Sequence, residues 1–436
     1  MGDMLGAIGV DAVEDLFSPI PPRFRLKGEL NIPRGVSELE LLDDTSRLAS
    51  RNRDCTEQVC FLGGGAYDHF IPTLVDAISA QSEFLTAYTP YQAEASQGIL
   101  QLFYEFQTMI CLLTGMEVAN ASLYEAASAA AEAVLMATAI TGRRRIILAE
   151  TTHPDTQRTL ATYMKQQDVE VFTAPARDGV LDEKATFELL GDSTAAVVFQ
   201  SPNFFGCVER LDKIIPSIHA CGALAIVATD PIAGGILKPP GAFDADIVVG
   251  EGQALGIPLQ YGGPYLGLLA TREKYLRKMP GRVVGMTKDL NDERGFCLAL
   301  QTREQHIRRE RATSNICTNQ GLLAIRASIY MAAMGKQGIG EVASRCFEKA
   351  HYAAERIADL KGYELRFPEA PFFKEFVVRT SRGVEKAIAR CRERGILGGV
   401  PLARFDKRYA DCFLVAVTEK RTKNEIDDLV SALDAV

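Results

Sequence analysis

Two polar residues stand at the ends of neighbouring apolar runs in the middle of the chain. Asp230 ends the run "ALAIVATD", and Gln253 follows the next run, "DIVVGEG". If these runs are parallel strands, their carboxyl ends meet at one edge of a sheet, which is where open α/β sheets bind ligands. We therefore expect Asp230 and Gln253 to lie at neighbouring strand ends. An amide has no nucleophilic amine, so Gln253 cannot form a Schiff base with a cofactor or substrate.

A glycine-rich stretch, "FLGGGAYDHFIP" (61–72), is a second candidate. It contains Gly64, Gly65, Tyr67 and His69. Glycines let the backbone approach a ligand closely. No Lys-Ser or Lys-Thr pair follows them, so the stretch is not a P-loop. A ligand-approaching backbone and a flexible loop that precedes a helix are equally compatible with the pattern.

The stretch "AYTPYQAEASQG" (87–98) groups polar aromatic and amide side chains. These are Tyr88, Thr89, Tyr91 and Gln92. Such side chains on a loop suit contact with a substrate or a subunit. Thr89 and Pro90 also fit the cap and first position of a helix. Both interpretations can hold together.

The stretch "NASLYEAASAAAEA" (120–133) opens an Ala-rich helix. Ser122 and the helix N-terminus are a candidate phosphate site. Glu125, however, lies in the first turn, where its charge would repel a phosphate. The pattern therefore favours a helix capped by its own acid.

A basic segment, "QTREQHIRRERATSNICTNQG" (301–321), surrounds His306 with arginines. These are Arg303, Arg308, Arg309 and Arg311. A solvated helix face with Glu304 and Glu310 as partners is one interpretation. An anion-binding or subunit-contacting edge is the other. No Ser-His-Asp or Cys-His pairing can be assigned from the sequence.

Composition excludes several classes of protein. The ten cysteines form no CxxC pair and only five histidines accompany them, so we expect no metal site and reduced thiols in a cytoplasmic protein. A formal net charge of −8 argues against a nucleic-acid partner. No apolar run approaches the roughly 18 residues of a membrane span, and the N-terminus has no secretory pattern.

The order of elements predicts an α/β protein. Continuous apolar runs at 145–150, 169–174, 195–200, 223–229 and 246–250 alternate with helical patterns, which indicates a mostly parallel sheet covered on both faces. The run at 265–272 is expected to return antiparallel. We expect an N-terminal arm (1–60), a large α/β domain (61–325) and a small C-terminal α+β domain (326–436).

Local signals place three helices and several strands. An apolar face over 92–114 ends at Gly115, an Ala-rich helix ends at Gly142, and a long helix covers 318–335 with Thr318 or Asn319 as its cap. In the last hundred residues "EFVVRT", "GILGGVPL" and "CFLVAVT" are expected strands. In the arm, "SPIPPRFR" (18–25) is expected to be extended and "VSELELLDDTSRLASRN" (36–52) helical.

Taken together, these motifs resemble the pyridoxal phosphate (PLP) enzymes of the aspartate aminotransferase fold (fold type I). In particular, the chain resembles the glycine dehydrogenase (decarboxylating) family, the P-protein of the glycine cleavage system. The resemblance covers nearly the whole chain. It rests on "FLGGGAYDHFIP", "YTPYQAEASQG", "SLYEAASAAAEA", "GEGQALGIPLQYGGP" and "RRERATSNICTNQ" in that order. They match the N-terminal half of the long P-protein, or subunit 1 (alpha) of the split enzyme.

The resemblance implies that Gln253 stands where the catalytic half of the family has its PLP lysine, with Asp230 matching the acid that pairs with the pyridine nitrogen. Asp230, Gln253 and Ser122 would then be a vestigial cofactor pocket without a catalytic residue. PLP would belong to glycine dehydrogenase subunit 2 (beta) in an α2β2 heterotetramer. That complex would decarboxylate glycine, with PLP as the electron sink, and pass the aminomethyl group to the lipoyl arm of the H-protein.

The glycine-rich loop and the 88–92 loop would border the partner's PLP site. Two alternatives stay open. One is a self-sufficient PLP enzyme that uses another lysine, such as Lys238 or Lys274. The other is a structural or regulatory pseudoenzyme subunit in another complex.

Overall fold

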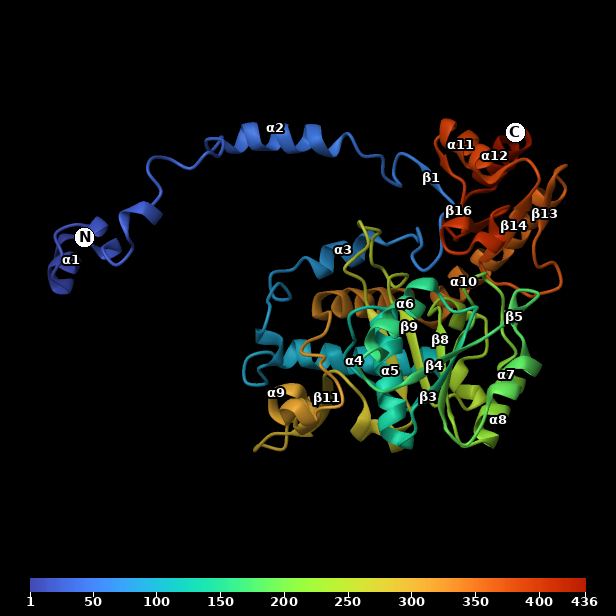
Figure 1. The fold of residues 1–436 in the computed structure, drawn as a ribbon, viewed down its shortest axis with the longest axis horizontal. Helices are drawn as coiled ribbons and strands as arrows, with labels where there is room; N and C mark the ends of the chain where they lie inside the picture. Colours follow the sequence, from blue (N-terminus) through green and yellow to red (C-terminus); the bar gives the residue numbers. More distant parts are fainter. The chain divides into compact units, whose positions relative to one another are not determined.

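The largest sheet has seven strands in the order β2-β10-β9-β8-β7-β3-β4 (Figure 1). The five strands from β9 to β4 are parallel, and β10 lies antiparallel to β9. The strands are β2 Val118–Ala119, β3 Arg145–Ala149, β4 Glu170–Ala174, β7 Thr194–Gln200, β8 Leu224–Thr229, β9 Ile247–Glu251 and β10 Gly267–Thr271. This computed structural model, which describes residues 1–436, confirms the expected α/β fold and its antiparallel return strand.

Helices cover both faces of this sheet, because the side chains of each strand alternate between two buried clusters. In β7, Val197 and Phe199 point to one cluster, whereas Ala196 and Val198 point to the other. The first cluster includes α4 (Gln97–Thr114), α8 (Leu211–Ala220) and α10 (Gly321–Ala358), and the second includes α5 (Ala126–Thr141) and α6 (Pro154–Met164). Such double coverage explains why the strands are continuously apolar.

Helix ends follow the glycine signals more closely than the helix starts. Gly115 and Gly142 end α4 and α5 in the left-handed conformation, as predicted. The predicted start of the first helix is wrong: Thr89–Tyr91 form a short 3-10 turn, η3, and α4 begins only at Gln97. The backbone turns extended at Gln92, which ends η3 before an α-helix can propagate.

The long helix α10 begins at Gly321, later than the predicted start at residue 318. Thr318 and Asn319 do not cap it, because both side chains bond to Tyr91 instead. Gly335 interrupts the helical backbone with φ 59° and ψ −176°, so α10 consists of two helices that meet at a kink there, and the predicted helix end at residue 335 is confirmed.

The C-terminal residues build a second, antiparallel sheet in the order β13-β14-β17-β16. Its strands are β13 Tyr363–Leu365, β14 Glu375–Thr380, β16 Val400–Pro401 and β17 Cys412–Ala416, and the helices α11 (Val384–Glu393) and α12 (Lys423–Asp434) pack with it. The small parallel pair β1 (Val59–Cys60) and β15 (Ile396–Leu397) joins the start of the glycine-rich stretch to this region.

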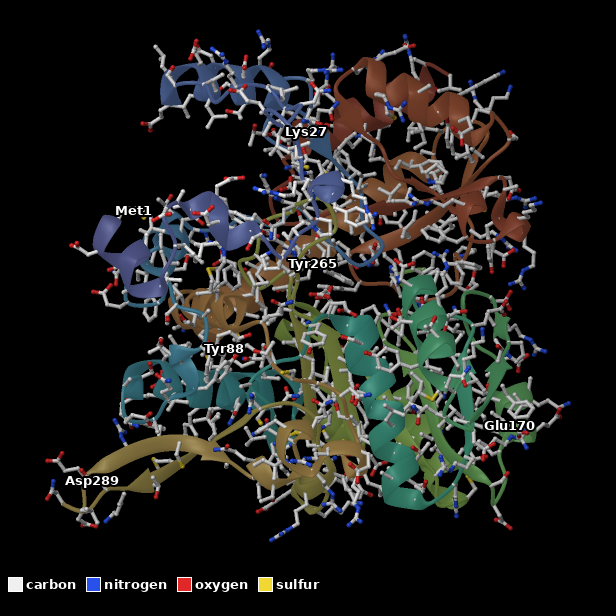
Figure 2. The ribbon with its side chains drawn as sticks, turned by 60° about the vertical axis from the view of Figure 1, so that its left-hand side comes forward. Met1, Lys27, Tyr88, Glu170, Tyr265 and Asp289 are labelled. Carbon is white, nitrogen blue, oxygen red and sulfur yellow. The ribbon has the colours of Figure 1, made fainter.

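The hairpin β11 (Val283–Lys288) and β12 (Arg294–Ala299) is not among the predicted strands, although both strands contain apolar residues, and its charges gather at the tip, residues 288–294. Asp289 marks its projecting tip in Figure 2. The remaining short elements are α3 Thr73–Ser79, β5 Ala176–Arg177, β6 Val180–Leu181, α7 Glu183–Leu189 and α9 Gln305–Arg308. No helix combines the length and the apolar character that crossing a membrane demands.

The chain divides into two compact units, residues 1–54 and residues 55–436. In the first unit, α1 (Gly2–Ile8) and α2 (Glu38–Ala49) are connected by irregular chain, and none of its residues is buried. The predicted helix over 36–52 is confirmed by α2, which Ser37 and Glu40 cap reciprocally. The expected extended stretch at 18–25 instead contains a 3-10 turn at Pro22–Phe24, since prolines fix φ near the value such a turn needs.

Candidate functional site

A cavity of about 300 Å³ lies at the carboxyl ends of β8 and β9. As predicted, Asp230 and Gln253 follow the ends of these neighbouring strands. Asp230 lines the cavity, whereas Gln253 is buried beside it. The other lining residues come from the glycine-rich loop, from the start of α5, from the region of His153 and from Phe373, Lys374 and Glu375.

Asp230 forms an ion pair with a lysine that the sequence does not point to. The Nζ atom of Lys374 lies 2.6 Å from Oδ2 of Asp230. It also lies 3.6 Å from the centre of the Tyr67 ring, a cation–π contact. Lys374 is only 2% exposed, so these contacts replace water around its ammonium. Lys374 precedes β14, far from Asp230 along the chain, and no spacing rule connects the two residues.

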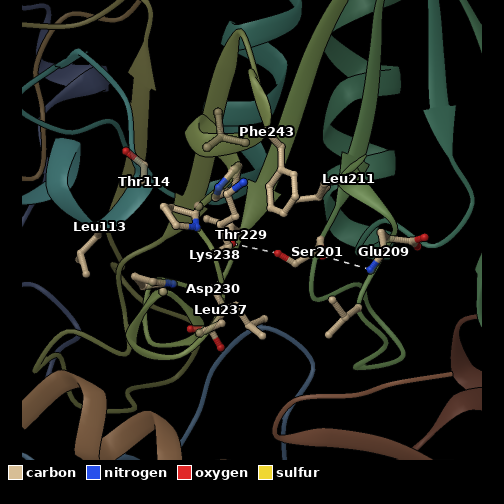
Figure 3. A pocket seen from close by; sticks show the side chains of 18 of the residues that line it. Leu113, Thr114, Ser201, Glu209, Leu211, Thr229, Asp230, Leu237, Lys238 and Phe243 are labelled. Carbon is tan, nitrogen blue, oxygen red and sulfur yellow. Dashed lines mark hydrogen bonds between the residues drawn. The ribbon is translucent and has the colours of Figure 1, made fainter. Parts of the chain in front are cut away.

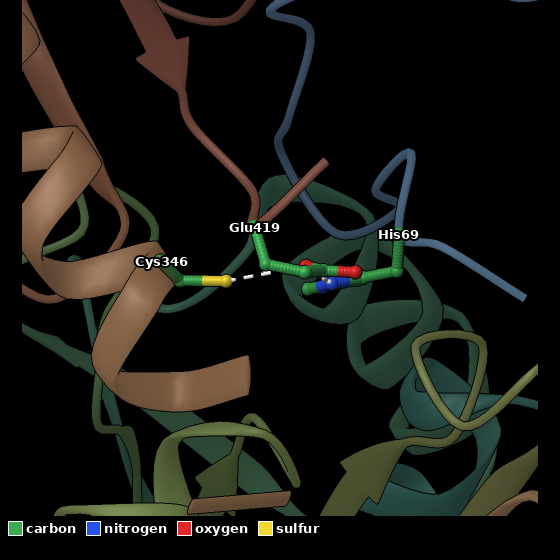
Figure 4. Close-up of side chains that lie close together, drawn as sticks. All are labelled: His69, Cys346 and Glu419. Atoms are coloured by element: carbon green, nitrogen blue, oxygen red, sulfur yellow. Dashed lines mark hydrogen bonds and ion pairs between the residues drawn. The ribbon is translucent and has the colours of Figure 1, made fainter. Parts of the chain in front are cut away.

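The same lysine continues into a buried chain of polar groups. Lys374 Nζ lies 3.0 Å from Nε2 of His69, and His69 Nδ1 lies 2.6 Å from Oε2 of Glu419. Figure 4 shows His69 and Glu419 with Cys346, whose thiol donates to the same carboxylate at 3.4 Å. Burial favours a raised pKa for Glu419, but the hydrogen bonds from His69 and from the Phe70 amide lower its pKa to about 2.

The tautomer of His69 follows from this geometry. A lysine ammonium can only donate, so Nε2 of His69 must accept and Nδ1 must carry the proton that Glu419 accepts. His69, Cys346 and Glu419 lie close enough together to suggest a metal site, with their ligand atoms within 4.8 Å of one another. In this arrangement both ring nitrogens are already engaged, which leaves no lone pair for a metal ion.

Gln253 fastens the glycine-rich loop to the turn after β9. Its Oε1 accepts from the Tyr67 amide at 2.8 Å, and its Nε2 donates to the carbonyls of Tyr67 and Ile257 at 3.1 and 2.8 Å. The side-chain amide is therefore fully used by backbone groups. Its role in this chain is that of a cross-link between two loops.

Glu375 holds the other side of the glycine-rich loop. Its carboxylate accepts from the Gly64 amide and from the Tyr67 hydroxyl, each at 2.7 Å. A Cβ at Gly63 would lie 2.2 Å from Oε1 of Glu375, so only glycine fits there. Burial raises the pKa of Glu375 to about 7. Gly65 lies beside His153, whose Nε2 is 2.6 Å from the Gly64 carbonyl.

The N-terminus of α5 faces the cavity, but carboxylates of the chain bind its amides. Glu125 accepts from Ser128 N at 2.7 Å, which confirms the predicted acid cap. Glu251 accepts from the amides of Ala126 and Leu266 at 3.1 and 2.9 Å, and burial raises its pKa to about 7. Ser122 does not line this cavity; it is buried and accepts from the Gln320 amide.

The loop 88–92 is anchored through Tyr91 and the buried Pro90. The Tyr91 hydroxyl bonds to Thr318 and Asn319, and the Arg282 guanidinium lies 5.1 Å from its ring centre. Tyr88 is 76% exposed, and Thr89 and Gln92 are exposed too. None of these four side chains lines the cavity of their own chain.

The basic segment is divided into a buried and an exposed part. Arg303 is partly buried and donates to the carbonyls of Met279 and Gly281. Arg308, Arg309 and Arg311 are exposed on α9 and the following turn. Only Arg311 forms an ion pair, a loose one with Glu310 at 3.8 Å. The sequence grouped these arginines correctly but could not separate the buried one from the exposed ones.

The two lysines considered as substitutes lie elsewhere. Lys238 lines a second, smaller cavity of about 180 Å³ (Figure 3), with its ammonium 4.4 Å from the centre of the Phe243 ring. Lys274 lies over Tyr275 and lines neither cavity. Lys374 is thus the lysine that faces the larger cavity. All ten cysteines are free, and five of them are buried, in agreement with the expected reduced thiols.

The fold and the cavity at its strand ends define a class: the PLP-dependent enzymes of fold type I. The chain superposes on a sphingosine-1-phosphate lyase from Burkholderia pseudomallei with a TM-score of 0.69 at 15% identity, over 96% of this chain and 93% of that one. A likeness at that level of identity concerns the fold alone.

The chain belongs to the glycine cleavage system P-protein family, whose model matches residues 1–433. It is 49% identical over 433 residues to a protein from Desulforamulus reducens named probable glycine dehydrogenase (decarboxylating) subunit 1, covering 99% of this chain and 97% of that protein. It superposes with a TM-score of 0.92 and 40% identity on an inhibitor-bound crystal structure of glycine decarboxylase (P-protein), covering 100% and 97% of the two chains.

The residues in the cavity do not fit PLP as this fold class holds it. The turn after β9 offers the amide of Gln253 where an amine is needed, and that amide is committed to backbone groups. The carboxylate of Asp230 is paired with Lys374. The N-terminus of α5, a natural phosphate site, faces Glu125 and Glu251.

Proposed function

We propose that this chain is the alpha subunit of a two-subunit glycine dehydrogenase (decarboxylating), an oxidoreductase complex of the glycine cleavage system, and that it holds no PLP itself. The proposal rests on Gln253 and Lys374. Gln253 stands where an amine would be needed to bind PLP, and Lys374 already pairs with the acid of the cavity, Asp230. Glycine decarboxylation by PLP, the cofactor that supplies the electron sink, then falls to a partner, subunit 2 (beta).

Partner, stoichiometry and location are part of the same proposal. The relatives' name, subunit 1, supports a second subunit. We propose an α2β2 heterotetramer in the cytoplasm, which delivers the aminomethyl group to the lipoyl arm of the H-protein. The free thiols of the chain support a reducing compartment.

This chain would then contribute to the reaction by contacting the partner subunit. The exposed side chains of the 88–92 loop have no role in the cavity of their own chain, and Tyr91 fixes the base of the loop. We assign this loop, with the glycine-rich loop, to the border of the partner's PLP site. Of the alternatives, self-sufficient PLP catalysis through Lys238 or Lys274 loses support from their positions.

Reconstitution with a candidate beta subunit tests the proposal. Exchange of CO2 with the glycine carboxyl is measured for the beta subunit alone, for the complex, and for complexes with Tyr88→Ala or Gln92→Ala. Both side chains are exposed, so their removal leaves the fold intact. We expect exchange to require both subunits and to fall in both variants, and the exposed Lys386→Ala on α11 to change nothing. A beta subunit that is fully active alone would refute the proposal, and unchanged exchange in both variants would refute the role of the loop. Tyr91→Phe, which removes the anchor of the loop, is expected to lower exchange as well.

A further inference from the structure

Three side chains in or beside the cavity at the ends of β8 and β9 bind groups that would be free in a PLP site: Lys374, Glu251 and Gln253. The sequence points to only one of them, Gln253. Glu251 ends β9, two residues before Gln253, and Lys374 comes from the segment before β14. This inference rests on the proposed function, in which the chain holds no PLP. It concerns the side chains that occupy the groups to which PLP would bind.

Lys374 competes for the acid that would bind a pyridine nitrogen. Its ammonium lies 2.6 Å from Oδ2 of Asp230 and stacks on Tyr67. A protonated pyridine nitrogen would need the same carboxylate. Two cations beside one carboxylate in a buried site repel each other, so the lysine must leave before the ring can bind.

Glu251 competes for the helix N-terminus. One carboxylate oxygen accepts from the Ala126 amide, and the other accepts from the amides of Gln253 and Leu266. A phosphate bound at the start of α5 would lie against this carboxylate and against Glu125. The electrostatic preference of the helix end for an anion is therefore already satisfied by the chain itself.

We propose that Lys374 and Glu251, together with Gln253, form an internal replacement for the cofactor, so that restoring the lysine at position 253 does not by itself restore PLP binding. The three side chains hold the glycine-rich loop, the start of α5 and the segment before β14 in one arrangement. The cavity thereby holds these three segments together and does not bind a cofactor.

The test is a titration of the isolated full-length chain with PLP. The wild type, Gln253→Lys, Gln253→Lys with Lys374→Met, and the same pair with Glu251→Gln are compared. A Schiff base forms when the ε-amine adds to the aldehyde of PLP and water leaves. Borohydride reduces it, and the mass gain is mapped to position 253 by peptide mass spectrometry. Gln167→Lys, which adds a lysine at an exposed position, gives the background of surface labelling.

We expect no PLP on the wild type and only background labelling of Gln253→Lys. The double variant should bind at least about tenfold more tightly than Gln253→Lys, and the triple variant about tenfold more tightly again. Binding by Gln253→Lys that equals that of the double variant would overturn the inference and leave the proposed function intact. PLP trapped on Lys374 of the wild type, above the background that Gln167→Lys defines, would instead refute the proposal that this chain holds no cofactor.

A second substitution keeps the test valid if Lys374→Met does not fold. Lys374→Gln retains a donor for Asp230 but removes the charge, and circular dichroism reports whether the chain is folded. With Gln253→Lys it should show labelling at position 253 that lies between those of the single and double variants. Labelling at background level in a folded Gln253→Lys/Lys374→Gln chain would contradict the assigned role of the Lys374 charge.

Discussion

The cavity at the strand ends and the basic segment 301–311 both gather charged residues, but they use charge in opposite ways. In the cavity, Lys374 is 2% exposed and each charged group has a partner within the chain. In the basic segment, Arg308 and Arg309 are exposed and form no ion pair. From sequence, the start of α5, which lines the cavity, is a candidate phosphate site, and the basic segment is a candidate anion-binding edge.

The difference separates charges that hold the fold from charges that are free for a partner. Burying a charge costs several kcal/mol, so a buried ion pair persists only where geometry and hydrogen bonds are complete. An exposed arginine has no such cost and can take part in recognition. In this chain the charged groups of the cavity are therefore part of the core, whereas the exposed arginines remain available at the surface.

The largest expected effect comes from breaking the pair at the base of the cavity. Lys374→Met leaves the mostly buried Asp230, whose side chain is 12% exposed, without its counter-charge, and we expect the free energy of unfolding to fall by about 3–5 kcal/mol. Denaturant unfolding of the full-length chain measures it. Lys374→Met combined with Asp230→Leu removes both charges and should recover most of the loss. Failure of the double variant to recover any stability would mean that the lysine acts through packing rather than through its charge.

A smaller effect concerns the pH dependence of stability. Burial raises the pKa of Glu375 to about 7, above its value in the unfolded chain. The folded state thus binds more protons between pH 4.5 and 7, and the stability from this group is complete at low pH and is lost as the pH rises through 7. Glu375→Gln should flatten this decline, by up to about 3 kcal/mol across the window.

Thermal or urea unfolding at several pH values measures this slope. The exposed Glu369→Gln, a few residues away, is the matched control and should leave the slope unchanged. Glu251 also has a pKa raised to about 7 by burial and remains in the variant, so the decline should become shallower without disappearing. An unchanged slope in Glu375→Gln would contradict the assignment.

The smallest expected effect lies on the basic segment. Removing the exposed charges in Arg308→Ala/Arg309→Ala should change the free energy of unfolding by less than about 0.5 kcal/mol. Urea unfolding of the isolated chain checks this against Lys374→Met measured in parallel. A loss comparable to that of Lys374→Met would remove the distinction between the two regions.

The sequence predicts most strands and helix ends of the large sheet because the signals for them are local. Apolar runs define the strands, and Gly115 and Gly142 mark helix ends, since one residue type suffices for each conformation. Asp230 and Gln253 could be placed at neighbouring strand ends because that depends only on strand order. The strands of the hairpin β11–β12 are short and carry only a few apolar residues, such as Val284 and Phe296, beside a charged tip, and no strand is predicted there.

The partners of the site residues could not be read from the sequence, because they depend on how the C-terminal sheet docks. Lys374 pairs with Asp230, and Glu419 with His69, across long stretches of chain. The residues that flank a lysine in the sequence do not indicate which buried acid it contacts in the fold. A lysine directly before a buried strand was the one available signal, and it is weak.

The parallel pair β1–β15 joins residue 59 to residue 396 and so links two distant parts of the polypeptide. A chain emerging from the ribosome cannot make this contact until almost all of its residues have been synthesised. The glycine-rich loop follows β1 directly, and Lys374, Glu375 and Glu419 also arrive late. Closure of the cavity is thus one of the last events of folding, and until then the seven-stranded sheet presents an open edge of strand ends to the cell.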